Sequence, residues 1–221
     1  MRKILPSQIL VFVLLFSLAC VLAWGTNRLA LDPLPLGEYR AIAKVAGFLL
    51  LLYLWALALF RAFFARFPLP VGEIAEGSRA EFVYHVYLLF FLILFYPVIR
   101  SGFMPVPLMR LFYQALGAKL GPNTYSSGLL LDPPFVEFGS NCIVGQFALI
   151  VPHVIEGTKL AHYPIKAGNN VTIGAGATVL SGVTIGDGAI VSTGAVVSKG
   201  TIIGAGEVWG GIPARLIGHI K

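Results

Sequence analysis

The chain has 221 residues and a net charge of +6, and 57% of its residues are hydrophobic whereas only 12% are charged. A soluble domain usually carries about 25% charged residues, so this composition does not favour a purely soluble protein. It also excludes a disordered chain, and with only Cys20 and Cys142 it excludes a disulfide scaffold. The basic excess lies mostly in residues 1–102, beside long hydrophobic runs, and indicates attraction to lipid headgroups rather than to nucleic acid.

Three hydrophobic runs in the front half are long enough to cross a bilayer, which takes about 20 apolar residues in a helix. They are Ile4–Trp24, Ala41–Phe60 and Phe82–Ile99. The first also resembles a signal peptide, since Arg2 and Lys3 precede it, but its length and the two runs that follow favour a retained helix. Three spans would place the amino terminus and the arginines of residues 61–79 on one side and the carboxyl-terminal domain on the other. The positive-inside count is nearly balanced and gives no orientation.

The next segment, Met104–Leu116, is predicted to be an amphipathic helix with Pro107 in its first turn. Apolar side chains recur there at helical spacing, at Leu108, Leu111, Phe112, Ala115 and Leu116. Such a helix either lies on the membrane surface and holds the following domain against it, or packs on the end of that domain. The sequence leaves both alternatives open.

A six-residue period fills the rest of the chain. Seven consecutive hexads begin with an aliphatic residue or Ala, and six of the seven have Gly in fourth place. Their first positions are Ala167, Ile173, Val179, Ile185, Val191, Val197 and Ile203. Strands repeat every two residues and helices every 3.6, whereas a three-sided coil of 18 residues explains a period of six. The same frame runs from Leu120 to Ile155, breaks over a five-residue insertion at Glu156–Leu160, and resumes at Ala161.

These hexads, together with the closing run Gly211-Ile212-Pro213-Ala214-Arg215, resemble the hexapeptide-repeat acyltransferases, which end in Gly-x-Pro-Ala-Lys/Arg. The resemblance covers Leu120–Ile217. It implies a left-handed parallel β-helix, assembly into a homotrimer, and acyl transfer from acyl-CoA. The expected fold class is therefore a set of N-terminal transmembrane helices followed by a left-handed parallel β-solenoid.

The hydrophobic runs and the resemblance together divide the chain into four parts. We expect a membrane domain with about three transmembrane helices over residues 1–102 and an amphipathic helical linker over residues 103–119. A β-helix acyltransferase domain follows over residues 120–209, and a tail over residues 210–221.

Acyl transfer needs a base that removes the proton of the acceptor, and His suits this role near neutral pH. In the resembled family a His in the loop before the uninterrupted repeats is that base, and the matching residue here is His153. A surface His at a corner is the alternative interpretation. Other residues are assigned as orienters or acceptor contacts, or alternatively as ordinary surface groups: His162, Glu156, Asp132, Glu137 and Ser127.

The resemblance also suggests a donor site, because family members lay the pantetheine arm of CoA along turn residues of successive coils. The matching positions are Ala175, Thr193, Ser198, Lys199 and Arg215. Lys199 and Arg215 would contact the CoA phosphates through charge-assisted hydrogen bonds. Taken alone, each would be an ordinary surface charge.

A metal site is not expected. The γ-type carbonic anhydrases share this solenoid and bind zinc through His residues of two subunits, and such a site takes three ligands. Only His153 and His162 lie in the repeats here, nine residues apart, and that spacing does not fit. Cys142 falls at an inward position and is interpreted as a small buried hydrophobe rather than a nucleophile.

Three functions remain open. The first is a membrane-bound O-acetyltransferase that moves acetyl from acetyl-CoA to a membrane-associated sugar, glycan or lipid. It would lie in the bacterial inner membrane with the repeats in the cytoplasm, where CoA is available. The second follows from His153–Gly157, which resembles acyltransferase-like modules of certain peptide synthetases that form amides from carrier-protein thioesters. The third is a non-catalytic trimeric membrane scaffold, and no nucleic-acid partner is expected for any of them.

Overall fold

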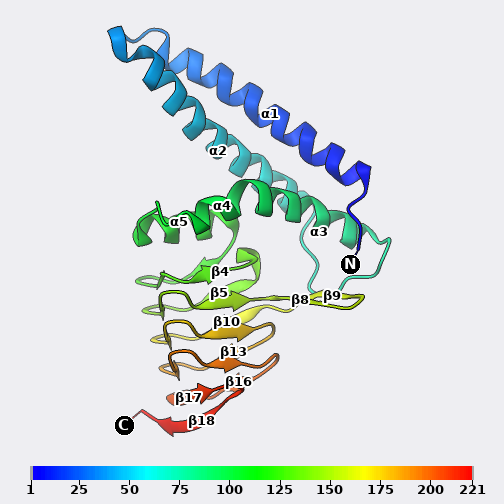
Figure 1. Ribbon diagram of the computed structural model, residues 1–221, viewed down its shortest axis with the longest axis vertical. Coiled ribbons are helices and arrows are strands. Elements are labelled where there is room, and N and C mark those ends of the chain that lie inside the picture. The colour runs from blue at the N-terminus through cyan, green and yellow to red at the C-terminus, as the bar shows by residue number, and fades with distance from the viewer. Residues whose placement is uncertain (1, 221) are drawn as a thin grey trace. The chain divides into compact units, whose positions relative to one another are not determined.

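The computed structural model describes residues 2–220, which divide into two units (Figure 1). A helical unit comprises residues 2–69 and 76–97, and a repeat unit comprises residues 70–75 and 98–220. The short segment 70–75 therefore lies between two helices in the sequence but belongs to the repeat unit.

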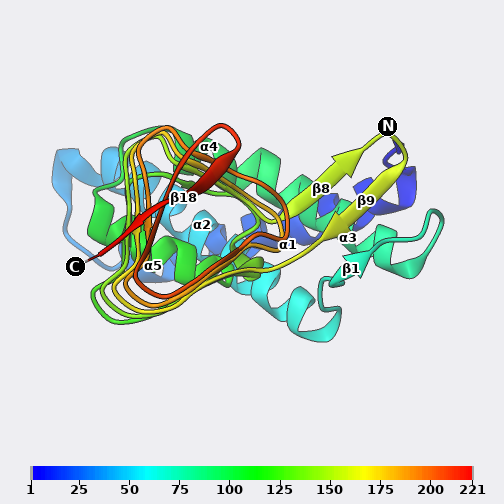
Figure 2. The ribbon, with the colours of Figure 1, turned by 90° about the horizontal axis from the view of Figure 1, so that it is seen from below.

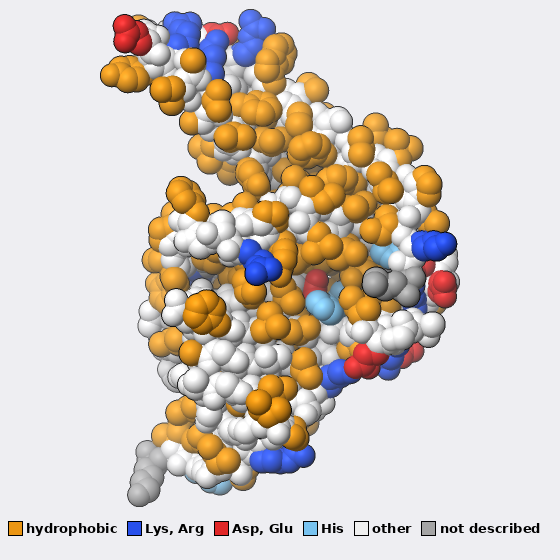
Figure 3. Space-filling model, in the orientation of Figure 1, with side chains coloured by type: hydrophobic (Ala, Val, Ile, Leu, Met, Phe, Trp, Pro, Cys, Tyr) orange, Lys and Arg blue, Asp and Glu red, His pale blue; other side chains and the backbone are white. Residues whose placement is uncertain are grey.

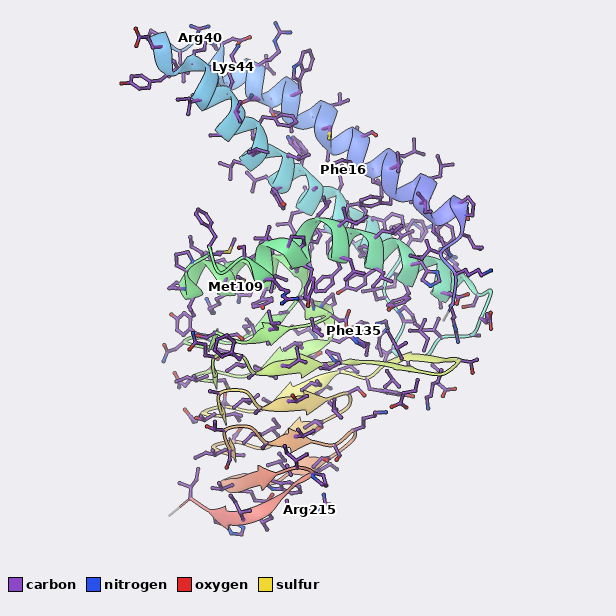
Figure 4. The ribbon with its side chains drawn as sticks, in the orientation of Figure 1. Phe16, Arg40, Lys44, Met109, Phe135 and Arg215 are labelled. Atoms are coloured by element: carbon purple, nitrogen blue, oxygen red, sulfur yellow. The ribbon has the colours of Figure 1, made fainter. Side chains whose placement is uncertain are left out.

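Two long helices, α1 (Pro6–Leu31) and α2 (Arg40–Arg66), lie side by side in the helical unit, joined through the short 3₁₀ helix η1 (Gly37–Tyr39). Hydrophobic side chains cover both, and charged side chains gather at the end where the two are connected (Figure 3). Figure 4 shows Arg40 and Lys44 at that end and Phe16 midway along α1. With 26 and 27 residues, each helix extends about 40 Å, more than the hydrocarbon thickness of a bilayer.

A third apolar segment consists of α3 (Arg79–Phe90), the π-helical turn η2 (Phe91–Phe95) and α4 (Tyr96–Arg100) in direct succession. The Ser78 hydroxyl caps its start by accepting a hydrogen bond from the Glu81 N–H at 3.1 Å. Pro97 lacks an N–H and crowds the preceding turn, and the wider π turn relieves this conflict. By length and composition alone, Pro6–Leu31, Gly37–Arg66 and Arg79–Arg100 are each able to cross a membrane.

The repeat unit has three faces of short parallel strands. The first face contains β2 (Lys119–Leu120), β5 (Val136–Phe138), β10 (Ile165–Ala167), β13 (Thr184–Ile185) and β16 (Ile202–Ile203). The second contains β3 (Tyr125–Ser126), β6 (Ile143–Val144), β11 (Thr172–Ile173), β14 (Ile190–Val191) and β17 (Glu207–Gly211). The third contains β4 (Leu129–Leu130), β7 (Leu149–Val151), β12 (Thr178–Leu180) and β15 (Val196–Val197). Seen along the stack, the coils form nested three-sided loops (Figure 2).

The predicted coil length is confirmed by the strand register. Ala167 pairs with Ile185, and Val179 pairs with Val197, so partners lie 18 residues apart. The first hexad positions point inward and are buried, which makes the core of this unit a column of aliphatic side chains. The left-handed winding remains a prediction from the resemblance.

The predicted five-residue insertion at Glu156–Leu160 is wrong in length. Val136 pairs with Ile165, and Leu149 pairs with Thr178, so partners across this coil lie 29 residues apart, 11 more than one coil. The extra residues form a projecting hairpin of β8 (His153–Glu156) and β9 (Lys159–His162). The 11 extra residues equal one complete hexad plus five. Adding a complete hexad does not shift the six-residue frame, so the sequence pattern reveals only the other five residues.

The two ends of the stack are covered. At the first end, α5 (Val106–Leu116) buries Met109, Tyr113 and Leu116. At the other end, β18 (Ala214–His219) pairs antiparallel with β17, so part of the expected tail is a strand. A helix or strand of this kind caps the terminal coil of a repeat structure, which would otherwise expose its core to solvent. The predicted helix over 104–116 is found, and it packs on the domain end. Leu108 and Leu111 of the predicted apolar stripe are exposed.

Replacing Tyr113 by Phe should destabilise this cap. The buried Tyr113 hydroxyl donates to the Gly128 carbonyl and accepts from the Leu130 N–H, both at 3.2 Å, and burial raises its pKa to about 12. Phe would leave the Leu130 N–H without this acceptor, whereas the Gly128 carbonyl would keep the Ser126 hydroxyl as a donor at 3.0 Å, and the expected cost is about 1–3 kcal/mol in the free energy of unfolding. Chemical denaturation measures this loss, and Tyr125→Phe at a partly exposed site is the control. Equal stability of the two variants would contradict the role of this hydroxyl.

Candidate functional site

The projecting hairpin leaves the stack at the corner between the third and first faces (Figure 2). We call this the hairpin corner, and it consists of residues 131–135, 152–164, 181–183 and 198–201. The corner between the second and third faces, residues 127–128, 145–148, 174–177 and 192–195, is called the second corner. The whole third face separates the two corners within one chain.

His153 and Asp132 meet at the hairpin corner. The Nδ1 atom of His153, the first residue of β8, lies 2.5 Å from Oδ2 of Asp132 in the preceding coil. The Asp132 side chain is 5% exposed and that of His153 is 26% exposed. The pair thus combines a shielded carboxylate with a partly exposed imidazole.

A local irregularity of the first coil brings Asp132 to this position. In the regular hexad frame Asp132 would point inward against Ile150, but Leu130 takes that place. The backbone of Asp132 adopts a left-handed conformation with φ of +44°, which Asp tolerates better than most residues. The 3₁₀ turn η3 (Pro133–Phe135) follows, and the Phe135 N–H donates to the Asp132 carbonyl at 2.9 Å.

The hydrogen bond selects one tautomer of His153. An ionised carboxylate only accepts hydrogen bonds, so the proton lies on Nδ1 and the lone pair on Nε2 is available as a base. Burial lowers the pKa of His153, whereas the hydrogen bond and the charge of Asp132 raise it, and the net shift is upward. The same carboxylate stabilises the imidazolium that forms when Nε2 takes a proton.

His162 lies behind this pair and is not the solvated turn residue that the sequence suggested. It is directly opposite His153 in the β8–β9 register and is fully buried. Its ring stacks on Phe135 with the centroids 4.5 Å apart. Burial lowers the pKa of His162, partly opposed by Asp132 and by the backbone of Pro70. The ring is therefore packed inside the corner, and its predicted role as an orienter or acceptor contact stays a prediction.

Glu156 does not orient His153. Alternation along β8 turns Glu156 and Val154 to the face opposite His153, and the Glu156 carboxylate pairs with the ammonium group of Lys199. A cavity of about 360 Å³ lies against this face of the hairpin. It is lined by Val154, Glu156, Lys159, Tyr163, Ser181, Gly182, Lys199 and Gly200. Lys199 and the neighbouring Ser198 therefore share the corner of His153.

The other predicted contacts lie elsewhere. Ser127, Ala175 and Thr193 are exposed at the second corner, and the Gly194 N–H donates to the Ala175 carbonyl in the next coil. Arg215 is in β18 at the far end of the stack, whereas Phe135 marks the end near the hairpin (Figure 4). Glu137 pairs with Lys119 on the first face and does not contact His153. The residues predicted to contact CoA therefore do not lie together within one chain.

Metal ligands and a thiol nucleophile find no support in the described part of the chain. Residues 2–220 contain no group of three His, Cys, Asp or Glu side chains that would hold a metal ion. Burial raises the pKa of the Cys142 thiol, which approaches the Gly168 carbonyl at 3.1 Å. This is the buried, protonated cysteine expected from its inward position.

Segment 70–75 was not predicted to belong to the site. Its strand β1 (Gly72–Glu73) pairs antiparallel with β9 and completes a three-stranded sheet with the hairpin. Gly72 pairs with His162, and Glu73 forms an ion pair with Lys159 at 2.8 Å. Nothing in a two-residue strand between hydrophobic runs signals this long-range pairing.

Comparison with known proteins identifies part of the repeat unit. Residues 168–199 match the family model described as bacterial transferase hexapeptide (six repeats). No curated protein matches the chain. The matched segment contains the regular coils that follow the projecting hairpin.

Several solved structures are similar over the repeats. A hexapeptide-repeat acetyltransferase from Vibrio cholerae is 22% identical, with 48% of this chain and 64% of that chain covered and a TM-score of 0.44. A maltose O-acetyltransferase from Clostridium difficile 630 is 28% identical, with 48% and 61% covered and a TM-score of 0.44. A galactoside acetyltransferase in complex with coenzyme A is 22% identical, with 57% and 76% covered and a TM-score of 0.42.

The chain spans less than two thirds of the length of the first two of these structures. The Vibrio cholerae protein has also been solved with acetyl coenzyme A.

Proposed function

We propose that this protein is a membrane-attached acyltransferase, and specifically an O-acetyltransferase with His153 as general base. The observation that carries the proposal is the short hydrogen bond between His153 and the shielded Asp132 beside the transferase repeat. It supplies what acyl transfer to a hydroxyl requires, namely a neutral imidazole held in one tautomer and a carboxylate that stabilises its protonated form.

The reaction needs no covalent enzyme intermediate. The acceptor oxygen attacks the thioester carbonyl while Nε2 of His153 takes the hydroxyl proton. The tetrahedral intermediate then collapses, the C–S bond breaks, and the imidazolium returns the proton to the leaving thiolate. A C–O bond forms and a C–S bond is lost, with no change in oxidation state.

The proposed donor is acetyl-CoA, the molecule bound in one of the similar structures. Ser198 and Lys199 adjoin the hairpin, whereas Ala175 and Thr193 lie at the second corner, so a donor that contacts all four requires two chains. This separation supports a homotrimer in which the second corner of one chain faces the hairpin corner of its neighbour. Lys199 would exchange Glu156 for a CoA phosphate, which costs little because exposed ion pairs contribute at most about 1 kcal/mol.

The proposed acceptor is a hydroxyl of a membrane-associated sugar, glycan or lipid. Three apolar helical segments support membrane attachment, which would raise the local concentration of such an acceptor at the site. Acetyl-CoA is available in the cytoplasm, so we place the repeat unit on the cytoplasmic side of a bacterial inner membrane.

Acetyl-CoA should stabilise the detergent-purified protein against heat. A ligand at about 100 times its dissociation constant adds about 2.7 kcal/mol to the free energy of unfolding. A Lys199→Ala/Arg215→Ala variant should lose most of this shift, whereas Lys119→Ala on the first face should retain it. If neither acetyl-CoA nor CoA shifts the transition, CoA is not the donor, and a carrier-protein thioester replaces it in the proposal.

A further inference from the structure

We infer that only α1 and α2 cross the membrane, that residues 79–100 do not span it, and that the exposed apolar side chains of α5 and the loop before it bind the bilayer surface. This inference replaces the predicted third span. It rests on the proposed membrane attachment but not on acyl transfer. It is supported by the strand pairing and aromatic packing inside each unit, together with the number of residues that connect one unit to the other.

The connection between α2 and α3 is held by the repeat unit. Gly72 and Glu73 pair with His162 and Ala161 of β9, and the Ile74 N–H donates to the Leu160 carbonyl at 2.9 Å. Residues 72–74 therefore lie in the same compartment as the hairpin. A third membrane span would need them on the opposite side.

Chain length excludes a detour across the bilayer. The six residue steps from Glu73 to Arg79 reach at most about 22 Å when fully extended, less than the ~30 Å of hydrocarbon. The other end is equally short, because six steps join Arg100 to Val106 of α5. Helix α5 is in turn fixed to the first coil through the Tyr113 hydroxyl. Both ends of residues 79–100 are thus restrained to one side.

Aromatic packing within the helical unit agrees with this. The Phe60 ring of α2 contacts Tyr87, Phe90 and Phe95, at centroid distances of 6.0, 5.8 and 5.1 Å. Tyr87 and Phe95 are separated by about 12 Å of helix rise, so the third segment crosses α2 near one point. A span parallel to α2 would instead meet successive turns along its length. Phe12, two turns into α1, makes the matching contact with Phe90 at 5.1 Å.

The lipid-facing side is visible on α5 and the loop before it. Met109 and Tyr113 face the first coil, whereas Leu108 and Leu111, one turn apart, are exposed. Phe103 in the preceding loop is 89% exposed. Exposed apolar side chains on a short helix that follows membrane helices suit insertion into the headgroup boundary of a bilayer. The bilayer surface is therefore the partner that we assign to this face.

Cysteine labelling of the full-length protein in sealed vesicles tests the topology. Glu76→Cys, Tyr39→Cys and His219→Cys place exposed thiols before α3, between α1 and α2, and in the repeat unit. The background is Cys20→Ala, which retains Cys142 because that thiol is buried. We expect a membrane-impermeant maleimide to reach the positions of Glu76 and His219 from one side and that of Tyr39 from the other.

Two results would overturn the inference in distinguishable ways. If the Tyr39 and His219 positions are labelled from one side and the Glu76 position from the other, three spans are present and the proposed function is unaffected. If all three positions are labelled from the same side, α2 does not cross the membrane, and the proposed two-helix membrane attachment needs revision as well.

A separate readout tests the lipid surface. An environment-sensitive fluorophore on Leu111→Cys should be quenched strongly by brominated phospholipids, whereas the same fluorophore on His219→Cys should not. Equal weak quenching at both positions would contradict lipid contact at α5.

Discussion

Replacing His153 by Gln should lower kcat for acetyl transfer by about 10²–10⁴-fold, the usual contribution of a positioned general base. Gln keeps a polar group of similar reach but has no basic nitrogen, so the acceptor hydroxyl must lose its proton unaided. The KM for acetyl-CoA should change little, because the proposed CoA contacts lie at Lys199 and Arg215. Transfer of radiolabelled acetyl from acetyl-CoA into the membrane fraction measures the effect.

The matched control is His219→Gln, which changes an exposed His of β18 at the far end of the repeat unit. This variant should retain full activity. Thermal unfolding of both variants separates a catalytic loss from a folding defect. Wild-type turnover in a folded His153→Gln protein would remove His153 from the mechanism.

Replacing Asp132 by Asn should give the second large effect and should also change the pH profile. The hydrogen bond and charge of Asp132 raise the pKa of His153 against the lowering effect of burial. Without that charge the pKa falls, so the imidazole stays neutral to lower pH, and the acidic limb of kcat/KM moves to lower pH. The plateau should nevertheless drop by about 10²-fold or more, because the imidazolium formed during transfer loses its partner.

The pH profile distinguishes this role from a purely structural one. A variant that merely loosened the hairpin would lose activity without moving the acidic limb. Glu137→Gln is the control, because that carboxylate belongs to the same coil but pairs with Lys119. An unchanged limb in a folded Asp132→Asn protein would contradict the proposed coupling between Asp132 and His153.

The repeats were predictable from the sequence because their pattern is local and redundant. The inward apolar residue recurs in every hexad and the turn Gly in six of the seven, so the register of Ala167, Ile185 and Ile203 follows from counting. The projecting hairpin was underestimated because its length hides one complete hexad. A periodic pattern determines position only to within a whole period.

The site was predictable in composition but only partly in arrangement. His153 and Asp132 were both named, yet Asp132 shared its role with Glu156 and Glu137. The left-handed turn at Asp132 selects among these carboxylates, and a single backbone angle of this kind has no periodic signature. The Phe135–His162 stack and strand β1 depend on contacts between residues far apart in the sequence, which local patterns do not encode.

The pairing of β1 with β9 has a practical consequence for anyone who wishes to study the repeats without the helices. A fragment that begins at residue 98 would lack residues 70–75 and would leave β9 as an open edge strand beside the buried His162. Unpaired edges of this kind invite association between copies. A version of the repeat unit without the helices therefore needs the 70–75 segment returned to it, for example through a flexible linker joined to the start of α5.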